Sequence, residues 1–155
     1  MVEPGDCPTL LAIQREPEVM CFWTSDDAAD DLLTQETDDE RLTAYAVTVD
    51  TEVIGWLGVA ENLDDTYRSA GLDLFITTAR QGNGFGTEAI SLVTRELFEA
   101  CGHHRVTIDP SAGNARAIRA YEKVGFRRVG VLRQYERGRD GTFHDGLLME
   151  LIRGE

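Results

Sequence analysis

The apolar residues in the middle of the chain follow the two-residue period of β-strands. Residues 42–49 and 53–60 are rich in strand-forming side chains and flank a polar turn, Asp50-Thr51-Glu52, so they predict a β-hairpin. A further strand is predicted over 70–78, where apolar side chains recur at every second position from Leu72. The later part of the chain adds a short candidate at 105–109 and a last strand pair at 126–135 and 143–152.

Two segments between these strands carry the period of an amphipathic helix. Residues 87–101 place four apolar side chains on one stripe, and residues 114–124 form a shorter helical segment. Gly125 follows the second segment directly, where glycine readily takes the left-handed conformation that ends a helix. The apolar positions of the first stripe are Ile90, Val93, Leu97 and Cys101.

Capping signals predict two more helices before the hairpin. Asp6 precedes Pro8, which suits the first turn of a helix. Ser25-Asp26-Asp27 opens a second helical stretch that extends to about Thr37, with acidic residues where the helix dipole favours them. Helices, a hairpin and then alternating strands and helices, without repeats or linkers, predict a single α/β domain over residues 1–155.

The chain is strongly acidic. It holds 28 acidic residues against 15 basic ones, for a net charge of −13, and Lys123 is its only lysine. A field of this sign repels nucleic acid and anionic membranes and attracts cations. Two explanations stay open. The acidity reflects adaptation to high salt or arginine-rich codon usage, or some of the acids line a pocket for a cationic substrate.

Cysteine usage and the absence of long apolar runs bear on the location of the protein. No apolar run approaches the roughly 20 residues that a membrane span needs. The first six residues also lack the basic and apolar regions of a signal peptide. Cys7, Cys21 and Cys101 are scattered, which favours reduced thiols over a disulfide framework or a zinc site. We therefore expect a cytoplasmic protein that binds neither nucleic acid nor membrane.

A glycine-rich turn joins the strand at 70–78 directly to the helix at 87–101. Glycines permit close backbone approach to a ligand, and N–H groups at a helix start bind anions, so the turn suits a pyrophosphate. The alternative is a plain connection without a ligand. The turn matches neither a P-loop, which needs Gly-Lys-Ser/Thr, nor the spacing of the dinucleotide fingerprint. Its sequence is Gln81-Gly82-Asn83-Gly84-Phe85-Gly86-Thr87.

The same turn resembles the coenzyme A signature Q/R-x-x-G-x-G/A of the GNAT superfamily of N-acetyltransferases. A second block, Asn114-Ala115-Arg116-Ala117-Ile118 with Tyr121-Glu122-Lys123-Val124-Gly125-Phe126, is similar to the N-x-x-A-x-x-x-Y-E-K-x-G-F block of that superfamily. The resemblance covers about residues 42–153. It implies a mixed, mostly antiparallel twisted sheet flanked by about four helices. Only Val2-Glu3-Pro4 precede the first helix, so the first strand is short or missing, or the true start lies upstream.

The resemblance implies acetyl-coenzyme A as co-substrate and no metal. The pyrophosphate would rest on the backbone from Gly82 to Thr87, within the turn that begins at Gln81. The pantetheine arm would lie beside the strand that ends at Phe75, Ile76 and Thr77. Asn114 would hydrogen-bond the pantetheine, although asparagine also serves well as a helix cap.

Tyr121 and Asp73 are the candidates for proton transfer. The resemblance places Tyr121 near the coenzyme A sulfur, where a phenol of pKa about 10 could protonate the departing thiolate. Its alternative role is that of a core aromatic. Asp73 is unusual inside a strand, and Gly71-Leu72-Asp73 resembles the Gly-Ile-Asp of some aminoglycoside 6'-N-acetyltransferases, where the aspartate is implicated in catalysis. Its alternative is an exposed strand aspartate.

Asp109 and Glu61 are the candidates for binding the acceptor. Thr107-Ile108-Asp109-Pro110-Ser111 resembles the Thr-Asp-Pro-Ser of the same enzymes, where the aspartate contacts the cationic drug, but Asp-Pro also forms turns. Glu61 could serve as base or as acceptor ligand. No metal site is predicted, because the histidines do not converge and are expected to be structural. They are His103, His104 and His144.

The resemblance implies direct transfer of the acetyl group to a primary amine in a ternary complex. The preferred acceptor is a small cationic amine such as an aminoglycoside 6'-amino group, and the protein is expected to be a monomer or homodimer. Phe143-His144-Asp145-Gly146-Leu147-Leu148-Met149 resembles the end of the ribosomal-protein N-terminal acetylating branch and of related polyamine enzymes. Those acceptors are alternatives, and so is a non-catalytic coenzyme A-binding sensor.

Overall fold

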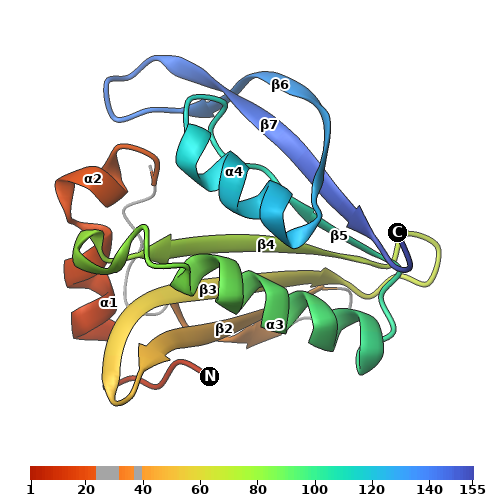
Figure 1. Cartoon of the computed structure of the whole chain (residues 1–155), viewed down its shortest axis with the longest axis horizontal. Helices are drawn as coiled ribbons and strands as arrows, with labels where there is room; N and C mark the ends of the chain where they lie inside the picture. Colours follow the sequence, from red (N-terminus) through yellow and green to blue (C-terminus); the bar gives the residue numbers. More distant parts are fainter. Residues whose placement is uncertain (24–31, 37–39) are drawn as a thin grey trace.

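The computed structural model describes residues 1–23, 32–36 and 40–155 (Figure 1). Its helices are α1 (Cys7–Gln14), α2 (Pro17–Met20), α3 (Phe85–Glu99) and α4 (Ala115–Val124), with a 3₁₀ turn η2 (Thr78–Arg80). Its strands are β1 (Gln35–Glu36), β2 (Glu40–Val49), β3 (Glu52–Asn62), β4 (Ser69–Ile76), β5 (Arg105–Ile108), β6 (Arg127–Arg137) and β7 (Phe143–Ile152). None of the helices in these ranges is long and apolar enough to cross a membrane.

The strands form one mixed sheet in the order β1-β2-β3-β4-β5-β7-β6. Every neighbouring pair is antiparallel except β4 and β5, which run parallel and are connected through α3. The predicted mostly antiparallel sheet with flanking helices is therefore confirmed. The only parallel pair among the described strands includes β4, the strand that leads into the glycine-rich turn.

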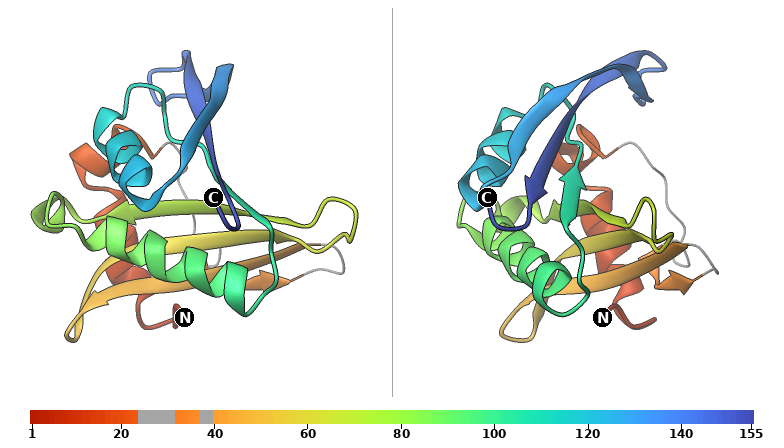
Figure 2. Two further views of the ribbon diagram at one scale, coloured as in Figure 1. Left: turned by 45° about the vertical axis from the view of Figure 1, so that its right-hand side comes forward. Right: turned by 90° about the vertical axis from the view of Figure 1, so that its right-hand side faces the viewer.

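The sheet splits at this parallel pair. β3 pairs with the whole of β4, from Ser69 to Ile76. β5, in contrast, pairs only with residues 70–72 of β4. β5 ends at Ile108, and Pro110, which has no N–H to donate, follows two residues later. The two strands meet at one end of the sheet and diverge toward the other (Figures 1 and 2). The edge of β4 beyond Leu72 is therefore left without a neighbouring strand.

Two apolar cores cover the two faces of the sheet. The larger core packs α3 and α4 on one face, and the smaller core packs α1 and α2 on the other (Figure 1). Adjacent residues of β3 serve both cores, because Leu57 belongs to the first and Trp56 to the second. Both helix layers hold the central strands in place, and these strands carry the edge left open by β5.

The hairpin and the later elements appear where the sequence predicts them. Gly125 has the expected left-handed conformation, with φ of 116°. α1 begins at Cys7, but the Asp6 carboxylate accepts a hydrogen bond from the Glu3 N–H at 2.9 Å instead of capping the helix. In the described part of the chain no strand precedes α1. A backbone hydrogen bond of 2.8 Å from Val2 N–H to the Ala44 carbonyl ties the N-terminus to β2.

The region before the hairpin departs from the prediction. Most of the helix predicted from Ser25 to Thr37 lies outside the described residues, but Gln35–Glu36 form strand β1 and pair with residues 41–42 of β2. The helical prediction is wrong there because the free edge of β2 offers hydrogen bonds that local propensity does not reveal. The four-residue helix α2 was not predicted, since it is too short to show a period.

Candidate active site

A cavity of about 620 Å³ opens where β5 diverges from β4. Its walls come from distant parts of the chain: the end of β4, the glycine-rich turn, α4, the loop after β5, β6 and α2. It therefore lies against the uncovered edge of β4. The carboxyl ends of the two parallel strands open into it, which is the usual place for a ligand in such a sheet.

The glycine-rich turn forms one end of this cavity. Gly82 and Gly84 have positive φ angles, 79° and 89°, which glycine adopts without a steric penalty. Gly84 is also the N-cap of α3, and its carbonyl accepts the first helical hydrogen bond, from the Glu88 N–H at 2.9 Å. The N–H groups of Phe85, Gly86 and Thr87 therefore have no partner within the helix. All of these residues line the cavity, where such N–H groups suit an anion.

Two polar side chains of the turn hold it in shape. The Gln81 amide donates to the Ile76 carbonyl at 2.8 Å, and the Asn83 amide donates to the Arg80 carbonyl at 3.2 Å. The Gln81 Oε1 atom is buried without a hydrogen-bond partner among the described residues. Gln81 thus fixes the end of β4 and keeps one acceptor beside the cavity, which it lines.

The end of β4 is firmly anchored on its other side. The Thr77 N–H donates to the Ile54 carbonyl at 2.8 Å, and the Thr77 hydroxyl donates to Glu16 at 2.6 Å. Burial alone would raise the pKa of Glu16, but hydrogen bonds from Thr77 and Thr78 outweigh it and lower that pKa. Phe75 stacks on Trp56 with ring centroids 5.8 Å apart. The end of the strand predicted to carry pantetheine is therefore held in place by these contacts.

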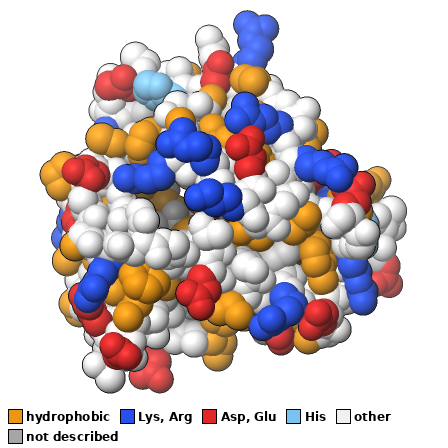
Figure 3. All heavy atoms as spheres, viewed as in Figure 1, with side chains coloured by type: hydrophobic (Ala, Val, Ile, Leu, Met, Phe, Trp, Pro, Cys, Tyr) orange, Lys and Arg blue, Asp and Glu red, His pale blue; other side chains and the backbone are white. Residues whose placement is uncertain are grey.

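The basic side chains that line the cavity come from α4 and from the residue before the glycine-rich turn. In a chain of net charge −13, four cations line it, and Figure 3 shows basic groups clustered over α4. Three of them follow at helical spacing on α4, so their shared face could have been found in the sequence. We call this group the basic wall. It consists of Arg80, Arg116, Arg119 and Lys123.

Acidic side chains also line the cavity, and they come from other elements. Asp73, exposed on the open part of β4, and Asp109, directly after β5, both line the cavity. Glu18 of α2 and Glu136 of β6 line it as well. We call these four carboxylates the acidic wall. The sequence predicted Asp73 and Asp109 for this place, and the other two were missed.

Tyr121 of α4 lies within range of the charges of Asp73 and Asp109. Its side chain belongs to the larger core, with 7% of its surface exposed, and it also lines the cavity. Burial, together with the negative charges of Asp73 and Asp109, raises the pKa of Tyr121 well above that of a free phenol. Both predicted roles are compatible with this position, and the hydroxyl stays protonated at neutral pH.

Aromatic residues also line the cavity. The Asp109 carboxylate, as a hydrogen-bond acceptor for the Tyr135 hydroxyl, raises the pKa of Tyr135 to about 12, and burial and the charge of Asp73 act in the same direction. The Trp23 ring meets the Phe75 ring edge-on, with centroids 5.0 Å apart. Trp23, Phe22 and Tyr135 all line the cavity. None of them was predicted, because their places depend on tertiary packing.

A model of the acetyltransferase (GNAT) domain matches residues 1–127. The chain belongs to this family. It is 34% identical over 105 residues to the aminoglycoside N(6')-acetyltransferase type 1 of Klebsiella pneumoniae, which is 60% of this chain and 51% of that protein. It is 26% identical over 147 residues to the probable N-acetyltransferase YjcK of Bacillus subtilis (strain 168), which is 86% of this chain and 81% of the relative. The chain thus spans about half the length of the first of these relatives.

Solved structures of GNAT proteins share the fold. Mycobacterium smegmatis RimJ in complex with CoA-disulfide has a TM-score of 0.84 at 19% identity, covering 98% of this chain and 79% of its own. The Vibrio cholerae spermidine N-acetyltransferase in complex with CoA and spermine has a TM-score of 0.78 at 20% identity. This match covers 98% of this chain and 92% of the neighbour's chain. AAC(6')-Ib in complex with ribostamycin and coenzyme A has a TM-score of 0.77 at 23% identity. This match covers 99% of this chain and 91% of the neighbour's chain. At these identities the likeness concerns the fold alone.

Asn114 occupies the start of the second GNAT block and caps α4. Its Oδ1 atom accepts a hydrogen bond from the Ala117 N–H at 3.1 Å. The residue also lines the cavity. The cap is therefore confirmed, and it leaves the side-chain amide group available for a ligand.

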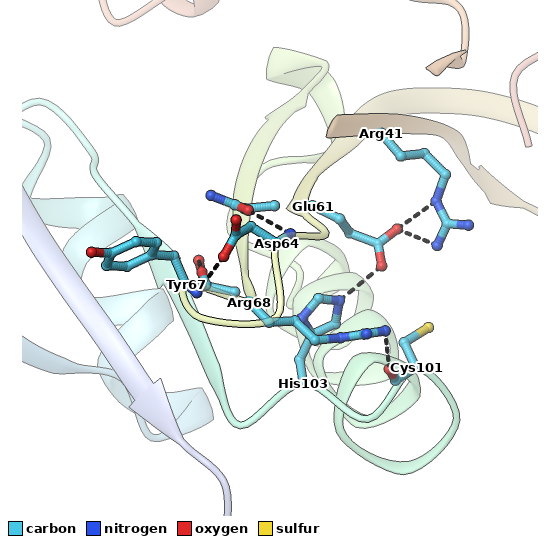
Figure 4. Close-up of polar contacts among 9 residues, drawn as sticks. Arg41, Glu61, Asp64, Tyr67, Arg68, Cys101 and His103 are labelled. Carbon is cyan, nitrogen blue, oxygen red and sulfur yellow. Dashed lines mark hydrogen bonds and ion pairs between the residues drawn. The ribbon is translucent and has the colours of Figure 1, made fainter. Parts of the chain in front are cut away.

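Glu61 is not brought to this cavity. It lies farther along β3, where its carboxylate accepts hydrogen bonds from Arg41 Nε at 2.7 Å and from His103 Nε2 at 2.8 Å (Figure 4). Glu61 and His103 are both buried. The buried carboxylate already has two side-chain partners and connects elements of the fold. The structure therefore does not support the predicted role of Glu61 in binding the acceptor amine.

Two of the three histidines have side-chain partners in the structure. His103 belongs to the Glu61 cluster, and His144 lies 3.2 Å from Asp140 in the β6–β7 turn. Within residues 1–23, 32–36 and 40–155, no group of three or more histidine, cysteine, aspartate or glutamate side chains is placed to hold a metal ion. Cys7, Cys21 and Cys101, all within the described residues, form no disulfide bond.

Proposed function

We propose that this protein is an acetyl-coenzyme A-dependent N-acetyltransferase for small cationic amines, and that its preferred acceptor is the 6'-amino group of an aminoglycoside. The observation that carries the proposal is that both signs of charge line one cavity. The basic wall and a helix N-terminus line it together with the acidic wall and aromatic rings. An anionic nucleotide and a cationic amine would each find a complementary side.

The basic side fits coenzyme A. The backbone from Gly82 to Thr87 would hold the pyrophosphate, because both left-handed glycines leave open space where a side chain would stand. The basic wall would pair with the remaining phosphate charge. The uncovered edge of β4 offers backbone groups to the amide-rich pantetheine arm, beside Asn114 and the unpaired Gln81 Oε1.

The acidic side fits a polycationic amine. Asp73 and Asp109 supply negative charge from two different elements, so two ammonium groups can be held at once. The rings of Trp23, Phe22 and Tyr135 add faces that attract ammonium groups and cover the ligand. Such a wall favours an acceptor that carries several positive charges and some apolar surface.

Proton transfer follows from the two central residues. Acetyl-coenzyme A would supply the activated acetyl group. Asp73, on the open edge of β4, would receive the proton that the ammonium must lose before it can attack. Tyr121, whose raised pKa keeps the hydroxyl protonated, would donate toward the departing sulfur. Holding both substrates in one cavity contributes further, because the reaction then becomes effectively unimolecular.

The relatives support an acceptor of this class. One relative is named as an aminoglycoside N(6')-acetyltransferase, and the neighbouring structures include enzymes bound to ribostamycin or spermine. A polyamine is chemically the same kind of acceptor. A protein N-terminus, as for a ribosomal-protein enzyme, carries one ammonium group and makes less use of an acidic wall. A coenzyme A-binding sensor would need neither Asp73 nor Tyr121.

Turnover against a panel of amines tests the proposal. Release of free coenzyme A is followed with kanamycin, spermidine, a lysine amide and an N-terminal peptide, and NMR of the product identifies the acetylated nitrogen. We expect kanamycin to give the highest kcat/KM, with acetylation at the 6'-amine. Efficient acetylation of the peptide alone would contradict the cationic-acceptor part, and coenzyme A binding without any turnover would support the sensor.

Removal of one acidic charge tests the site itself. Asp109→Asn keeps the size of the side chain and should raise the KM for kanamycin about tenfold, with a smaller change in kcat. Asp65→Asn removes an equal charge from an exposed position that does not line the cavity, so its KM should stay near wild type. Equal effects of both substitutions would show that only the overall charge matters.

A further inference from the structure

Strand β6 carries an irregularity beside the acidic wall. Its pairing with β7 shifts register between Leu132 and Glu136. Gln134, in the middle of this stretch, has a backbone φ of +50°. Residues other than glycine and asparagine rarely adopt this conformation. The two residues that follow, Tyr135 and Glu136, both line the cavity. The bulge thus changes the direction in which this part of β6 presents its side chains.

The Asp145 side chain holds the bulge. Its Oδ1 atom accepts a hydrogen bond from the Gln134 N–H at 2.8 Å, so the strained residue gains a charge-assisted partner across the strand pair. Asp145 is not among the residues that line the cavity. It belongs to the segment 143–149, whose sequence resembles protein-acetylating enzymes and for which the proposed reaction assigns no role.

The backbone around Asp145 also holds the loop that carries Asp109. The Asp145 carbonyl accepts from the Ala112 N–H at 2.8 Å, and the Leu147 N–H donates to the Pro110 carbonyl at 2.9 Å. An isolated antiparallel bridge joins Ser111 to the residue after Asp145. One stretch of β7 is therefore attached both to the loop after β5 and to the bulge of β6.

Gly146 makes room for the ring that the bulge directs. A Cβ atom at this position would lie 2.9 Å from Tyr135 Cδ1, closer than real side chains approach. The Tyr135 ring therefore lies over Gly146, and from there its hydroxyl faces Asp109. Asp145 and Gly146 together determine where Tyr135 stands.

We infer that Asp145 is a positioning residue for the acceptor site: it holds the β6 bulge and the loop after β5 together, so that Tyr135 and Asp109 face one cationic acceptor. The inference rests on the proposed function, because it assigns an acceptor to the acidic wall. Asp145 acts through the Gln134 N–H and makes no contact with the acceptor itself.

Kinetics with kanamycin and acetyl-coenzyme A provide the first test. Asp145→Ala removes the acceptor of the Gln134 N–H and should raise the KM for kanamycin about three- to tenfold, while the Kd for coenzyme A stays unchanged. Asp145→Asn keeps an oxygen that can accept this bond, so it should stay within about twofold of wild type. Gly146→Ala displaces the same ring from below and should resemble Asp145→Ala.

A double-mutant cycle separates positioning from general damage. Tyr135→Phe removes the hydroxyl that faces Asp109. If Asp145 acts by placing this hydroxyl, Asp145→Ala should cost little more in a Tyr135→Phe background. Fully additive effects on KM would overturn the inference, and so would an Asp145→Asn variant as impaired as Asp145→Ala.

NMR of the whole protein reads the position without any acceptor. The ring above Gly146 should shift the Gly146 Hα resonances upfield in wild type and in Asp145→Asn, and this shift should be lost in Asp145→Ala. A retained shift in a folded Asp145→Ala variant would overturn the inference. Absence of turnover with every amine, together with the expected Gly146 shifts, would instead contradict the proposed function and leave the positioning by Asp145 standing.

Discussion

The Tyr121 hydroxyl is placed where its environment opposes ionisation. Burial and the charges of two aspartates raise its pKa, so at neutral pH it is a hydrogen-bond donor and never a base. Such a group suits the donation of a proton toward a departing thiolate, whose negative charge appears only as the reaction proceeds. In a purely structural role the same hydroxyl would matter for folding alone.

Tyr121→Phe should therefore lower kcat by roughly 100-fold and leave the KM for acetyl-coenzyme A nearly unchanged. The ring still fills its place in the core, so the melting temperature should change little. Tyr67→Phe is the matched control, because Tyr67 is 72% exposed and does not line the cavity. The measurement is steady-state kinetics under conditions where chemistry limits turnover. A wild-type kcat in Tyr121→Phe would show that the role of Tyr121 is purely structural.

Single residues of the site were predictable where a local pattern marked them. Asp73 stood out as an aspartate inside a strand, and Asp109 and Tyr121 stood in short family blocks. Tyr135 showed no such signal, because its direction depends on a bulge that Asp145 holds from another strand. Glu61 was assigned to the acceptor because a strand glutamate gives no sign, in the sequence, of the partners that bury it.

At the scale of elements, the start of α3 joins a strained turn to a ligand site. Gly84 and Gly102 stand at opposite ends of this helix, both with positive φ, and in both cases an added Cβ atom would meet nothing within 4 Å. Alanine at either position costs about 1–2 kcal/mol of stability from backbone strain alone. Only Gly84 lines the cavity. The pair therefore separates strain from ligand contact.

Gly84→Ala should weaken coenzyme A binding about tenfold, whereas Gly102→Ala should bind it as the wild type does. Both variants should lose a similar amount of stability, since both force alanine into the left-handed region. Calorimetric titration with coenzyme A and thermal unfolding measure the two effects on the same samples. Equal affinities in both variants would contradict a phosphate site at the start of α3.

The regular elements were readable from the sequence and the short ones were not. α4 showed a helical segment with a glycine stop, and β2 and β3 flanked a polar turn, so local signals and tertiary packing agreed. β1 and α2 have two and four residues, too few for a period to appear. The divergence of β5 from β4 was also hidden, because it depends on which strands pair and for how many residues.

The buried cluster around Glu61 ties elements together away from the cavity. It joins Arg41 of β2 and Glu61 of β3 to His103, between α3 and β5 (Figure 4). Glu61→Gln should lower the free energy of unfolding by about 2 kcal/mol or more, because it leaves buried partners without a matching charge. Glu52 lies on the same strand as Glu61 and forms an exposed ion pair with Arg80. Glu52→Gln breaks this pair and should cost less than about 1 kcal/mol. Urea unfolding measures both.

The effect of Glu61→Gln should depend on pH. Burial would raise the pKa of Glu61, but hydrogen bonds from His103 and Arg41 outweigh it, so the folded-state pKa lies below the ordinary 4.5. The contribution of the carboxylate is therefore complete above pH 4.5 and is lost as the pH falls through the lowered value. The difference in stability between wild type and Glu61→Gln should shrink in acid. A constant difference down to about pH 3 would show that the charge of Glu61 contributes nothing.

At the scale of the whole molecule, the charge of the cavity differs from that of the chain. The basic and acidic walls contain four residues each, so the cavity is balanced within a molecule of net charge −13. The remaining surface carries the excess of acid. This excess generates a long-range field that attracts cations and repels anions.

Salt should therefore act unequally on the two substrates. Screening weakens the long-range field, since the Debye length falls from about 10 Å at 0.1 M to about 3 Å at 1 M salt. The kcat/KM for a polycationic acceptor should fall several-fold over this range, and more steeply than for an amine with one charge. The kcat/KM for acetyl-coenzyme A should fall much less, because the same salt also screens the repulsion between this anion and the acidic surface.

Thermal unfolding at each salt concentration separates this effect from folding. If the acidity of the chain is an adaptation to high salt, stability rises with salt and both kcat/KM values follow the folded fraction. If the field steers the acceptor, the acceptor's value falls even where the protein is fully folded at every concentration. Equal salt dependence for amines carrying one and several charges would contradict steering, because the attraction to a net charge of −13 grows with the charge of the ligand.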